Sequence, residues 1–419
     1  MGEGQILIAA GGWHDDSPGG AYRLPTDFAR YLVRQGHRVA YICPSKLASC
    51  DKPEDCAGVE VNRYSVGETS SPSIINLAAH LYRSRRIAAR IASRSAVSVL
   101  LGHAPLQYLG SLSGCSPKRK CYTVHSPFAA ELRSNYPNRP KLSRRGAWAA
   151  AKRIEAHIYS KSNIVQCFSD YILHQLQQDY GSRLTGKCVV LPAWVDTNRF
   201  KPSPESASRI RSLLGKPWNA RVPTFVTVRR LVSRMGLDTL LEAAAILSKE
   251  RLDFNVVIAG QGPLLEQLRN QTSALALENR VAFLGRVSEE VLINIFRAGD
   301  CFVLPTRSLE GFGLIILEAY ACCTPVIAVP VGAIPEVLGA SFQGWLARDN
   351  SPVALAERMR DFLMGRLIAD SEALRRRALE FDFNVMAAMH EHLLLEMESE
   401  AVTAAKTAVT STIINEPRL

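Results

Sequence analysis

Short apolar runs alternate with amphipathic helical stretches along most of the chain. This alternation starts once near the N-terminus and again near the middle of the chain, and we call each start an opening. The first opening leads from an apolar run at Gln5–Ala10, through a loop rich in Gly, Asp and Pro, to a helical pattern at Leu24–Gln35 and a second apolar run at His37–Ile42. The second opening places an apolar run at Pro223–Leu231 before a helical pattern at Leu237–Lys249. Strands that alternate with helices in this way pair in parallel and bury both faces of their sheet. The sequence therefore predicts an α/β fold of two Rossmann-like, doubly wound domains.

The remaining apolar runs fit the same two sheets and set the expected domain boundaries. We expect an N-terminal domain over residues 1–195, a C-terminal domain over 196–377, a final helix over 378–400 and a flexible tail over 401–419. A length of 419 residues agrees with two or three domains. Further strands are expected at Val97–Leu101, Lys120–Val124, Ile164–Phe168, Phe254–Ala259, Val281–Leu284, Cys301–Pro305 and Pro325–Val329.

Composition excludes several classes of protein. Apolar residues make up 47% of the chain and charged residues 21%, which is ordinary for a globular protein and excludes a disordered or fibrous one. No run reaches about 18 uninterrupted apolar residues, so we expect no transmembrane helix. The start of the chain lacks the basic and long apolar regions of a signal peptide, and the ten cysteines include no Cys-x-x-Cys pair. We therefore expect a cytoplasmic protein with reduced thiols.

The net charge of +11 is confined to the first half of the chain. Residues 1–196 hold 25 of the 50 Lys and Arg residues but only 14 of the 39 Asp and Glu residues, whereas residues 197–419 hold 25 of each kind. Halves that differ this much in charge suggest two domains with different partners.

Two basic stretches account for much of this charge. Five arginines recur along the helical pattern at Arg83–Arg94, and a second set at Arg139–Arg153 includes Trp148, with Ile154 and Ile158 nearby. Basic residues with an apolar side and a Trp suit an anionic membrane surface, so a peripheral position at the inner face of a membrane is one expectation. A solvated basic face is the alternative.

The densest chemical signal contains two glutamates, Glu310 and Glu318, after the apolar run that ends at Pro305. Glycines between them let the backbone approach a ligand closely, and a helix that begins near Gly313 would turn its first amides toward an anion such as a diphosphate. One carboxylate can hold the vicinal hydroxyls of a ribose, and the other can face a sugar or its developing charge. Two solvated glutamates at a helix start are the alternative. The candidate donor-binding residues here are Glu310, Gly311, Phe312, Gly313, Leu314 and Glu318.

Three arginines form the second signal. Arg229, Arg230 and Arg234 flank the end of the strand expected at Thr224–Val228. Guanidinium groups at the carboxyl end of a parallel strand suit phosphate oxygens, because open α/β sheets bind their ligands at that edge. A solvated basic turn is the alternative.

Two weaker signals lie in the first half. Gly19 and Gly20 precede the first helix, where their backbone amides could reach a phosphate, although a plain turn fits equally well. His125 follows an apolar run, and a histidine at a strand end can donate a hydrogen bond to a sugar hydroxyl or act in proton transfer. A buried structural histidine is the alternative for His125.

Several other sites are not supported. His14, Asp15 and Asp16 cluster in the first loop, but no second group of ligands at a suitable spacing makes a metal site with them, so we expect a simple loop and no metal. The chain has neither the Gly-x-Gly-x-x-Gly fingerprint nor a Walker A motif, which disfavours nicotinamide and ATP sites. It also lacks the Gly-x-Ser-x-Gly elbow of serine hydrolases.

Taken in order, these motifs resemble those of the retaining glycosyltransferases of sequence family 4. The resemblance extends from Ile6 to about Leu394. It implies the GT-B fold, in which two Rossmann-like domains face each other across a cleft and the C-terminal helix crosses back to the N-terminal domain. The matching segments are Gly19-Gly20 with Gly36–Val39, His125, Leu191–Phe200, Arg230–Val232 with Gly236–Asp238, Gly260–Pro263, Phe283–Gly285, and the paired Glu310 and Glu318.

The resemblance also implies a reaction. A nucleotide-diphosphate sugar binds mainly to the C-terminal domain and passes its sugar, with retention of configuration and without a metal or other cofactor, to an acceptor hydroxyl held mainly by the N-terminal domain. Glu310, His125 and Arg230 become the expected catalytic residues. Arg230 and the amides near Gly313 would stabilise the leaving diphosphate. Glu318 would hold the ribose, Glu310 the donor sugar, and His125 the sugar near its reacting carbon.

The chain departs from the family pattern at the phosphate loop. Arg229 stands where the family usually has Gly, and Met235 stands where it usually has a Lys that shares the diphosphate with Arg230. Because Met is neutral, one of two expected charges is missing, and we hypothesise that Arg234 or Arg229 replaces it. Ala193-Trp194 and Cys323 are further departures.

The sequence leaves the donor base, the sugar and the acceptor open. The acceptor class includes carbohydrates, lipid-linked molecules and natural products, and no nucleic-acid module is visible despite the basic charge. Within the same fold, an epimerase or a phosphorylase is a weaker alternative, since no lysine among the C-terminal motifs could carry the pyridoxal phosphate of a phosphorylase. A catalytically silent protein that binds nucleotide sugars is the alternative from another class.

Overall fold

The computed structural model describes residues 4–16, 19–45, 52–65, 74–135, 141–184, 186–203 and 222–395. These residues fall into two compact units. The first contains residues 4–133 and 141–193 and includes the C-terminal residues 384–395, and the second contains residues 194–203 and 222–383. The predicted tail over 401–419 lies outside the described residues. Among the described residues, no helix is long and apolar enough to cross a membrane.

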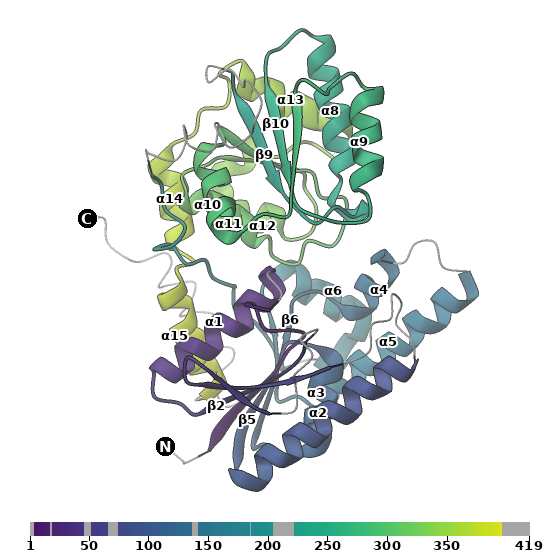
Figure 1. Ribbon diagram of the computed structural model, residues 1–419, viewed down its shortest axis with the longest axis vertical. Coiled ribbons are helices and arrows are strands. Elements are labelled where there is room, and N and C mark those ends of the chain that lie inside the picture. The colour runs from purple at the N-terminus through teal and green to yellow at the C-terminus, as the bar shows by residue number, and fades with distance from the viewer. Residues whose placement is uncertain are drawn as a thin grey trace. The chain divides into compact units, whose positions relative to one another are not determined.

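The first unit is built on an 8-stranded sheet in the order β3-β4-β2-β1-β5-β6-β7-β8. Its strands pair in parallel, except that β3 runs antiparallel to β4. Strands β2, β5 and β6 of this sheet are labelled in Figure 1. β1 is buried along its whole length, as expected for a parallel strand covered on both faces. The strands are β1 (Gln5–Ala9), β2 (Val39–Pro44), β3 (Glu54–Cys56), β4 (Val59–Tyr64), β5 (Val97–Gly102), β6 (Arg119–Val124), β7 (Ile164–Cys167) and β8 (Cys188–Val190).

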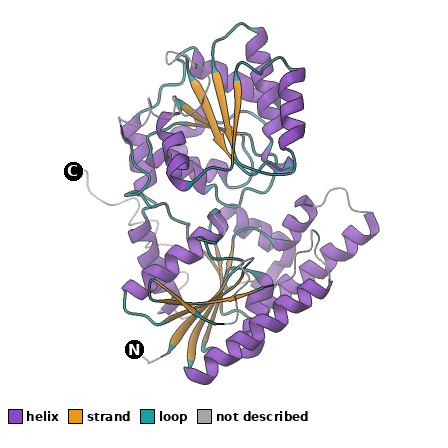
Figure 2. Ribbon diagram, in the orientation of Figure 1, coloured by secondary structure: helices purple, strands orange, loops and turns teal. Residues whose placement is uncertain are grey.

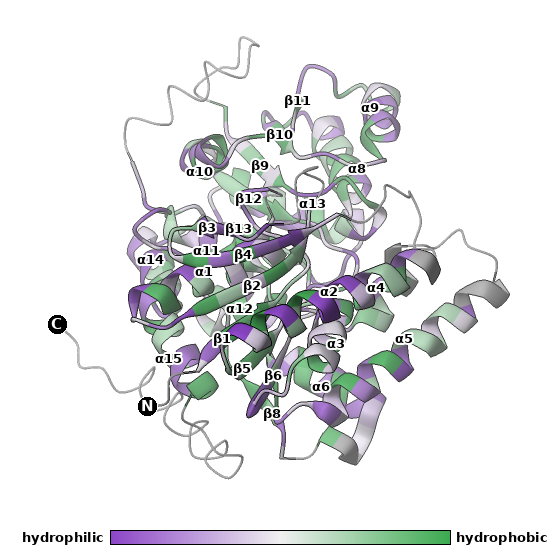
Figure 3. Cartoon of the chain, turned by 60° about the horizontal axis from the view of Figure 1, so that its bottom comes forward, coloured by the Kyte–Doolittle hydropathy of each residue, from purple (hydrophilic) through white to green (hydrophobic). Residues whose placement is uncertain are grey.

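Helices cover both faces of this sheet (Figure 2). The connection from β1 to β2 and the connection from β5 to β6 run in opposite directions along the sheet, and right-handed crossovers therefore put their helices on opposite faces. In Figure 3 the hydrophilic colour is prominent on parts of α2. The helices are α1 (Gly20–Arg34), α2 (Ile74–Arg94), α3 (Pro105–Gly114), α4 (Phe128–Asn135), α5 (Lys141–Lys161), α6 (Asp170–Tyr180), the 3-10 helix η1 (Gly181–Leu184) and α15 (Phe383–Leu395).

The final helix, α15, packs in the first unit, which confirms the expected return of the C-terminal helix. Glu391 accepts hydrogen bonds from Tyr31 at 2.9 Å and pairs with His37 at 2.6 Å. His390 lies between Gln166, at 2.9 Å from its Nδ1, and the carbonyl oxygen of Pro192, at 2.8 Å from its Nε2. These contacts tie the last described helix to residues more than 190 positions earlier in the chain.

The second unit is built on a 5-stranded parallel sheet in the order β11-β10-β9-β12-β13. Its strands are β9 (Thr224–Val228), β10 (Asn255–Ala259), β11 (Val281–Gly285), β12 (Cys301–Leu304) and β13 (Val326–Ala328). Its helices are η2 (Ser233–Met235), α8 (Leu237–Lys249), α9 (Leu265–Ala274), α10 (Glu289–Ala298), α11 (Leu314–Ala321), α12 (Ile334–Leu338), η3 (Ala340–Trp345), α13 (Pro352–Leu363) and α14 (Ser371–Leu379).

Each sheet reverses its direction of growth once. In the first unit the chain builds outward from β1 to β2 and β4 and then returns to place β5 on the other side of β1. In the second unit it builds from β9 to β10 and β11 and then places β12 on the other side of β9. Ligands of open α/β sheets bind at the carboxyl ends of the strands at such a reversal. The loops after β9 and β12 and those after β1 and β5 are therefore where a ligand is expected to bind.

Candidate functional site

The loops that follow β9 and β12 lie against each other in the second unit, because these two strands are neighbours. The backbone N–H of Arg307 donates to the carbonyl oxygen of Arg234 at 2.8 Å. A Cβ atom on Gly236 would stand 1.8 Å from the carbonyl oxygen of Pro305, and Gly236 has a φ of 69°. Only glycine fits that approach and that left-handed backbone. The glycine of the predicted phosphate loop therefore joins the two loops closely.

A third loop, after β10, completes this edge of the sheet. The N–H of Leu231 donates to the carbonyl oxygen of Gln261 at 2.9 Å. A Cβ atom on Gly262 would lie 2.3 Å from the carbonyl oxygen of Leu231, so the two backbones touch without a side chain between them. The Gly260–Pro263 motif thus supports the loop that carries the three arginines.

Arg229 and Glu310 form an ion pair across the loops after β9 and β12. Arg229 Nη2 donates to Glu310 Oε2 at 2.7 Å and to Thr306 Oγ1 at 3.0 Å. The side chains of Arg229 and Glu310 are only 7% and 15% exposed, so each charge is compensated mainly by the other. The guanidinium also contacts the Sδ atom of Met235, at 2.8 Å from Nη2. The charge of Arg229 thus lies beside position 235, where the resemblance predicts a lysine.

The other two arginines have different surroundings. Arg234 Nη1 donates to the carbonyl oxygen of Leu309 at 2.9 Å and so supports the loop before α11. Leu309 has a φ of 58°, a left-handed conformation that is strained for a residue with a side chain. Arg230 is exposed, and within the part of the chain that the structure describes its side chain has neither a hydrogen bond nor an ion pair. Of the three, Arg230 is therefore the guanidinium best able to accept an anion.

The helix α11 begins as the sequence predicts. Gly313, with a φ of 92°, is its N-cap, no side chain caps it, and its first turn contains no acidic residue. The first amides and the positive end of the helix dipole are therefore left for a ligand. Gly311 and Phe312 are buried, Leu314 is half-buried, and Glu318 is buried within the helix.

The backbone of Glu310 is fixed as firmly as its side chain. Its carbonyl oxygen accepts from the N–H of Ala333 at 2.9 Å. A Cβ atom on Gly332, which has a φ of 63°, would stand 2.2 Å from the same oxygen. Both the side chain and the backbone of Glu310 are therefore held in place, the carboxylate by Arg229 and the carbonyl oxygen by Ala333.

The glycines before α1 are less constrained. Gly19 is the N-cap of α1, which has no side-chain cap and no acidic residue in its first turn. A Cβ atom on Gly19 would meet nothing within 4 Å, so packing does not require glycine there. Close approach of a ligand to Gly19 and Gly20 stays a prediction.

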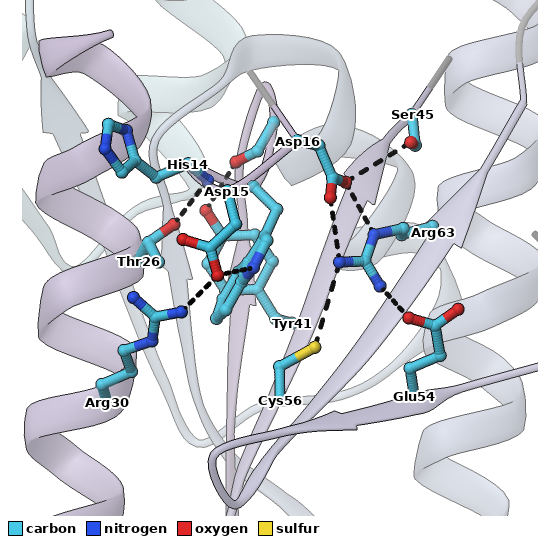
Figure 4. A network of polar contacts seen from close by, with 12 residues as sticks. His14, Asp15, Asp16, Thr26, Arg30, Tyr41, Ser45, Glu54, Cys56 and Arg63 are labelled. Atoms are coloured by element: carbon cyan, nitrogen blue, oxygen red, sulfur yellow. Dashed lines mark hydrogen bonds and ion pairs between the residues drawn. The ribbon is translucent and has the colours of Figure 1, made fainter. Parts of the chain in front are cut away.

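The acidic residues of the first loop form ion pairs, as Figure 4 shows. Asp15 pairs with Arg30, and Asp16 accepts from Arg63 Nε at 2.6 Å. Arg63 also pairs with Glu54 at 2.7 Å. Both carboxylates are therefore used to hold the loop between β1 and α1. Among the described residues no group of three or more His, Cys, Asp or Glu side chains is placed to hold a metal ion.

His125 lies directly after β6 and contacts a second histidine. Its Nε2 atom is 2.9 Å from Nδ1 of His103, which follows the neighbouring strand β5. Burial lowers the pKa of His125 to about 4 and holds the pKa of His103 well below its ordinary value. Sequence reasoning missed His103, although its position directly after an apolar run is the same signal that identified His125.

The predicted site residues thus divide between the two units. Gly19, Gly20 and His125 belong to the first unit. The residues brought together at one edge of the second sheet are Arg229, Arg230, Arg234, Glu310, Gly311, Phe312, Gly313, Leu314 and Glu318.

Two family models match the chain, one for each half. The model described as Glycosyltransferase Family 4 matches residues 18–199, and the model described as Glycosyl transferases group 1 matches residues 215–380.

Curated relatives match parts of the chain. The GDP-mannose-dependent monoacylated alpha-(1-6)-phosphatidylinositol monomannoside mannosyltransferase of Corynebacterium glutamicum is 34% identical over 188 residues, which are 43% of this chain and 48% of the relative. The D-inositol 3-phosphate glycosyltransferase of Geodermatophilus obscurus is 32% identical over 249 residues, which are 57% of this chain and 54% of the relative. The chain therefore spans about half the length of these curated relatives.

Solved structures share the fold over nearly the whole chain. Sucrose-phosphate synthase from Thermosynechococcus elongatus superposes with a TM-score of 0.78 at 19% identity, covering 93% of this chain and 98% of that one. Anabaena Alr3699/HepE in complex with UDP and glucose superposes with a TM-score of 0.73 at 18% identity, covering 94% and 100%. The predicted GT-B fold is confirmed. Glycosyltransferase family models thus match most of the chain, the Family 4 model over residues 18–199 and the group 1 model over residues 215–380.

Proposed function

We propose that the protein is a retaining, metal-independent glycosyltransferase that moves a hexose from a nucleotide-diphosphate sugar to an acceptor hydroxyl. One observation carries this proposal. The loops after β9 and β12 bring cationic groups, a free helix start and two glutamates together where the second sheet reverses its direction. Such a set complements a diphosphate next to a sugar better than any other ligand that the sequence suggests.

The leaving diphosphate is the group whose charge increases in the proposed reaction. The bond between the anomeric carbon and the phosphate oxygen breaks, and its electron pair leaves with the diphosphate while the acceptor oxygen bonds to the same carbon. The proton of the acceptor hydroxyl passes to an oxygen of the leaving diphosphate. We assign the exposed Arg230 and the first amides of α11, at Gly313 and Leu314, to that charge. A guanidinium and amide N–H donors placed where negative charge develops stabilise the transition state more than the substrate.

Arg229 is proposed to replace the lysine that the family usually has at position 235. The contact of its guanidinium with Met235 supports this choice over Arg234, whose side chain is directed to the carbonyl oxygen of Leu309. Arg229 also holds Glu310, at 2.7 Å. One side chain would then supply positive charge to the diphosphate region and orient the carboxylate that faces the sugar.

The remaining donor contacts are assigned from the resemblance. Glu310 would hold the donor sugar, and Glu318 would hold the ribose. Gly311 and Phe312 would line the donor through their backbone. In the first unit, His125 would contact the sugar near its reacting carbon, and Gly19 and Gly20 would approach the diphosphate. None of these roles requires a cofactor or a metal, and turnover that persists in a chelator would test the metal-independent part.

The names of the relatives suggest which substrates to test first. The relative from Corynebacterium glutamicum is named as GDP-mannose-dependent and as acting on a phosphatidylinositol monomannoside, and that from Geodermatophilus obscurus as a D-inositol 3-phosphate glycosyltransferase. We propose GDP-mannose among the first donors and lipid-linked or phosphorylated inositols among the first acceptors. Other carbohydrates and natural products remain in the acceptor panel.

The basic face of the first unit is proposed to meet an anionic acceptor or membrane surface. On α2, Arg83, Arg85 and Arg86 are exposed, and Arg86 lies over the ring of the exposed Tyr82 at 5.7 Å. On α5, the exposed Trp148 has Lys152 over its ring at 4.6 Å.

The structure corrects one part of the expected apolar side of this face. Ile158 is fully buried in the core of the first unit, and Ile154 is packed against that core. Among the side chains of α2 and α5 that the structure describes, Tyr82 and Trp148 are therefore the large apolar groups that are exposed. Arg139 lies outside the described residues.

A catalytically silent protein that binds nucleotide sugars is the second candidate, because Met235 removes the usual lysine. Mass spectrometry of reactions with UDP-, GDP- and ADP-sugars and the acceptor panel separates the two. A product one hexose heavier, with the anomeric configuration of the donor, supports the proposed enzyme. Tight binding of a donor with no product and no released nucleotide supports the silent candidate.

A further inference from the structure

We propose that His103 is a positioning residue that keeps the proton of His125 on Nδ1, so that His125 donates a hydrogen bond to the donor sugar. The inference rests on the proposed function for the role of His125, but it is carried by the contact between the two imidazoles. His103 Nδ1 and His125 Nε2 are 2.9 Å apart.

The fold places the two rings together and holds both. β5 and β6 are neighbouring strands, so the residues that follow them meet at the same edge of the sheet. The backbone N–H of His103 donates to the carbonyl oxygen of Ala9 at 2.8 Å, which fixes the start of its loop. The rings of Phe168 and His125 pack in a T-shaped arrangement, with centroids 5.1 Å apart. Rotation of the His125 ring would break this contact and the hydrogen bond with His103.

Both imidazoles are neutral in the folded protein near pH 7. Burial lowers the pKa of each one, to about 4 for His125 and well below its ordinary value for His103, where the neighbouring His125 and His390 add to the effect. A neutral imidazole carries a proton on one nitrogen only. The hydrogen bond between the rings therefore contains a single proton, which belongs to one histidine or the other.

The second nitrogen of His103 indicates which histidine donates. His103 Nε2 is buried and has no hydrogen-bond partner among the residues that the structure describes. If His125 donated, the proton of His103 would lie on this Nε2 and would leave a buried N–H without an acceptor. Buried N–H groups without partners are rarer than buried acceptors without partners. The geometry therefore favours donation from His103 Nδ1 to His125 Nε2.

This assignment fixes what His125 can do. Since its Nε2 accepts from His103, its own proton lies on Nδ1, and no other described residue bonds that atom. A neutral imidazole with its proton on Nδ1 can donate to a sugar hydroxyl oxygen, but it cannot remove a proton from that hydroxyl, because the lone pair of Nε2 already accepts from His103. The two roles that the sequence left open for His125 are thus reduced to one.

The tautomer can be measured directly by NMR of protein with ¹⁵N-labelled histidine. The His125 signals are identified by their absence from His125→Asn. In the wild-type protein we expect protonated Nδ1 and unprotonated Nε2 for His125. His103→Leu removes the donor, and we expect the His125 signals to move toward the other tautomer or a mixture. His103→Asn keeps an N–H donor near the position of Nδ1, and we expect it to preserve the wild-type pattern.

Kinetics with the best donor provide the second readout. We expect His103→Leu to lower kcat/KM about tenfold, since a hydrogen bond to the sugar is lost, and His103→Asn to restore most of it. His157→Leu, which changes an exposed histidine of α5, is the matched control and should leave both readouts unchanged.

Three outcomes would overturn the inference: protonated Nε2 on His125 in the wild-type protein, an unchanged His125 tautomer in His103→Leu, or equal activity in His103→Leu and the control. If no donor is turned over by the wild-type protein, the proposed function fails, while the imidazole signals still decide the tautomer. Failure of the function and failure of the inference are therefore distinguishable.

Discussion

At the scale of single residues, the phosphate loop shows how a chain can depart from a family pattern and keep a cation beside the same position. Met235 is neutral, but the guanidinium of Arg229 contacts its sulfur atom and forms an ion pair with Glu310. A methionine is flexible and polarisable, so it can serve as a platform for a planar cation. The two departures, Arg for Gly at 229 and Met for Lys at 235, are therefore best understood as one paired change.

A swap of the two residues tests this pairing. We expect Arg229→Gly to lower kcat/KM about a hundredfold, because Glu310 loses its partner and the diphosphate region loses a cation. Adding Met235→Lys to that variant restores the family arrangement and should raise its kcat/KM at least tenfold above that of Arg229→Gly alone. Steady-state kinetics of the single and double variants are the measurement. Equal activity of Arg229→Gly with and without the lysine would contradict the pairing.

His390 gives a prediction about acid stability. It is buried between Gln166 and the carbonyl oxygen of Pro192, and burial lowers its pKa to about 4. In the unfolded chain the same histidine has a pKa of about 6.5, so neutral His390 contributes to the free energy of unfolding fully above that pH. This stabilisation is lost as the pH falls from about 6.5 to about 4. At pH 5 the loss is about 2 kcal/mol.

Denaturant unfolding at pH 7 and pH 5 checks this. His390→Gln should reduce the difference in unfolding free energy between the two pH values by about 2 kcal/mol. His174→Gln, which changes an exposed histidine of α6, should leave the difference as it is in the wild-type protein. An unaltered difference in His390→Gln would show that His390 is not the group responsible.

At the scale of elements, the donor site depends on loops that approach each other through glycine. The loop after β9 touches the loops after β10 and β12 backbone to backbone, at Gly262 and Gly236. Side chains at these positions would force apart the strand ends that carry Arg230 and Glu310. The glycines therefore set the spacing of the charged groups.

Gly236→Ala measures that dependence. The new Cβ atom would lie 1.8 Å from the carbonyl oxygen of Pro305, on a backbone with a φ of 69°. We expect a loss of unfolding free energy of about 2 kcal/mol or more, together with at least tenfold weaker donor binding. Gly344→Ala is the matched control, since a Cβ atom there meets nothing within 4 Å. Denaturant unfolding and calorimetric titration of a donor are the measurements, and equal effects of the two variants would contradict the role of Gly236.

Many of the helices and strands could be predicted from the sequence, because the spacing of apolar residues indicates where they lie. The helix at Leu237–Lys249 begins and ends where the pattern places it, and β10 and β12 each agree with their prediction within one residue at either end. The helix α1 begins at Gly20, four residues before the predicted start, because its first turn has no apolar pattern. The β3–β4 hairpin was not predicted, since its first strand is short and exposed.

The site was less predictable than the fold, because its decisive contacts join residues that are distant in sequence. Arg229 and Arg234 both lie near position 235 in the sequence, so the sequence suggested either one as the replacement for the usual lysine. Only their contacts, of Arg229 with Met235 and of Arg234 with Leu309, distinguish them. His103 could not be linked to His125 before the order of β5 and β6 was known. Ile158 follows a basic stretch in sequence and was expected on the exposed basic face, but on α5 its side chain points into the core of the first unit.

At the scale of the whole molecule, the charge asymmetry agrees with a division of labour between the units. The second half is neutral overall, and three of its arginines, Arg229, Arg230 and Arg234, lie at the proposed diphosphate site. The first half carries the whole excess of +11, and part of it is exposed on α2. We therefore expect the first unit to be the one that responds to anionic surfaces.

Vesicle binding tests this expectation. The wild-type protein should bind vesicles of anionic lipid more tightly than vesicles of neutral lipid at low salt, and the difference should shrink as salt screens the charges. Arg83→Glu combined with Arg86→Glu should reduce the anionic binding at least tenfold. Lys249→Glu combined with Arg376→Glu changes the net charge equally in the second unit and should have little effect. Indistinguishable binding to the two kinds of vesicle would contradict a membrane role for this face.

The most direct test of the central claim is nucleotide release in the presence of the acceptor panel. We expect the wild-type protein to turn over at least one UDP-, GDP- or ADP-sugar. We also expect a rate at least a hundredfold lower in Glu310→Ala and an unchanged rate in Glu290→Ala, which changes an exposed glutamate of α10. Turnover that is equal in Glu310→Ala and in the control, or no turnover of any donor by the wild-type protein, would contradict the central claim.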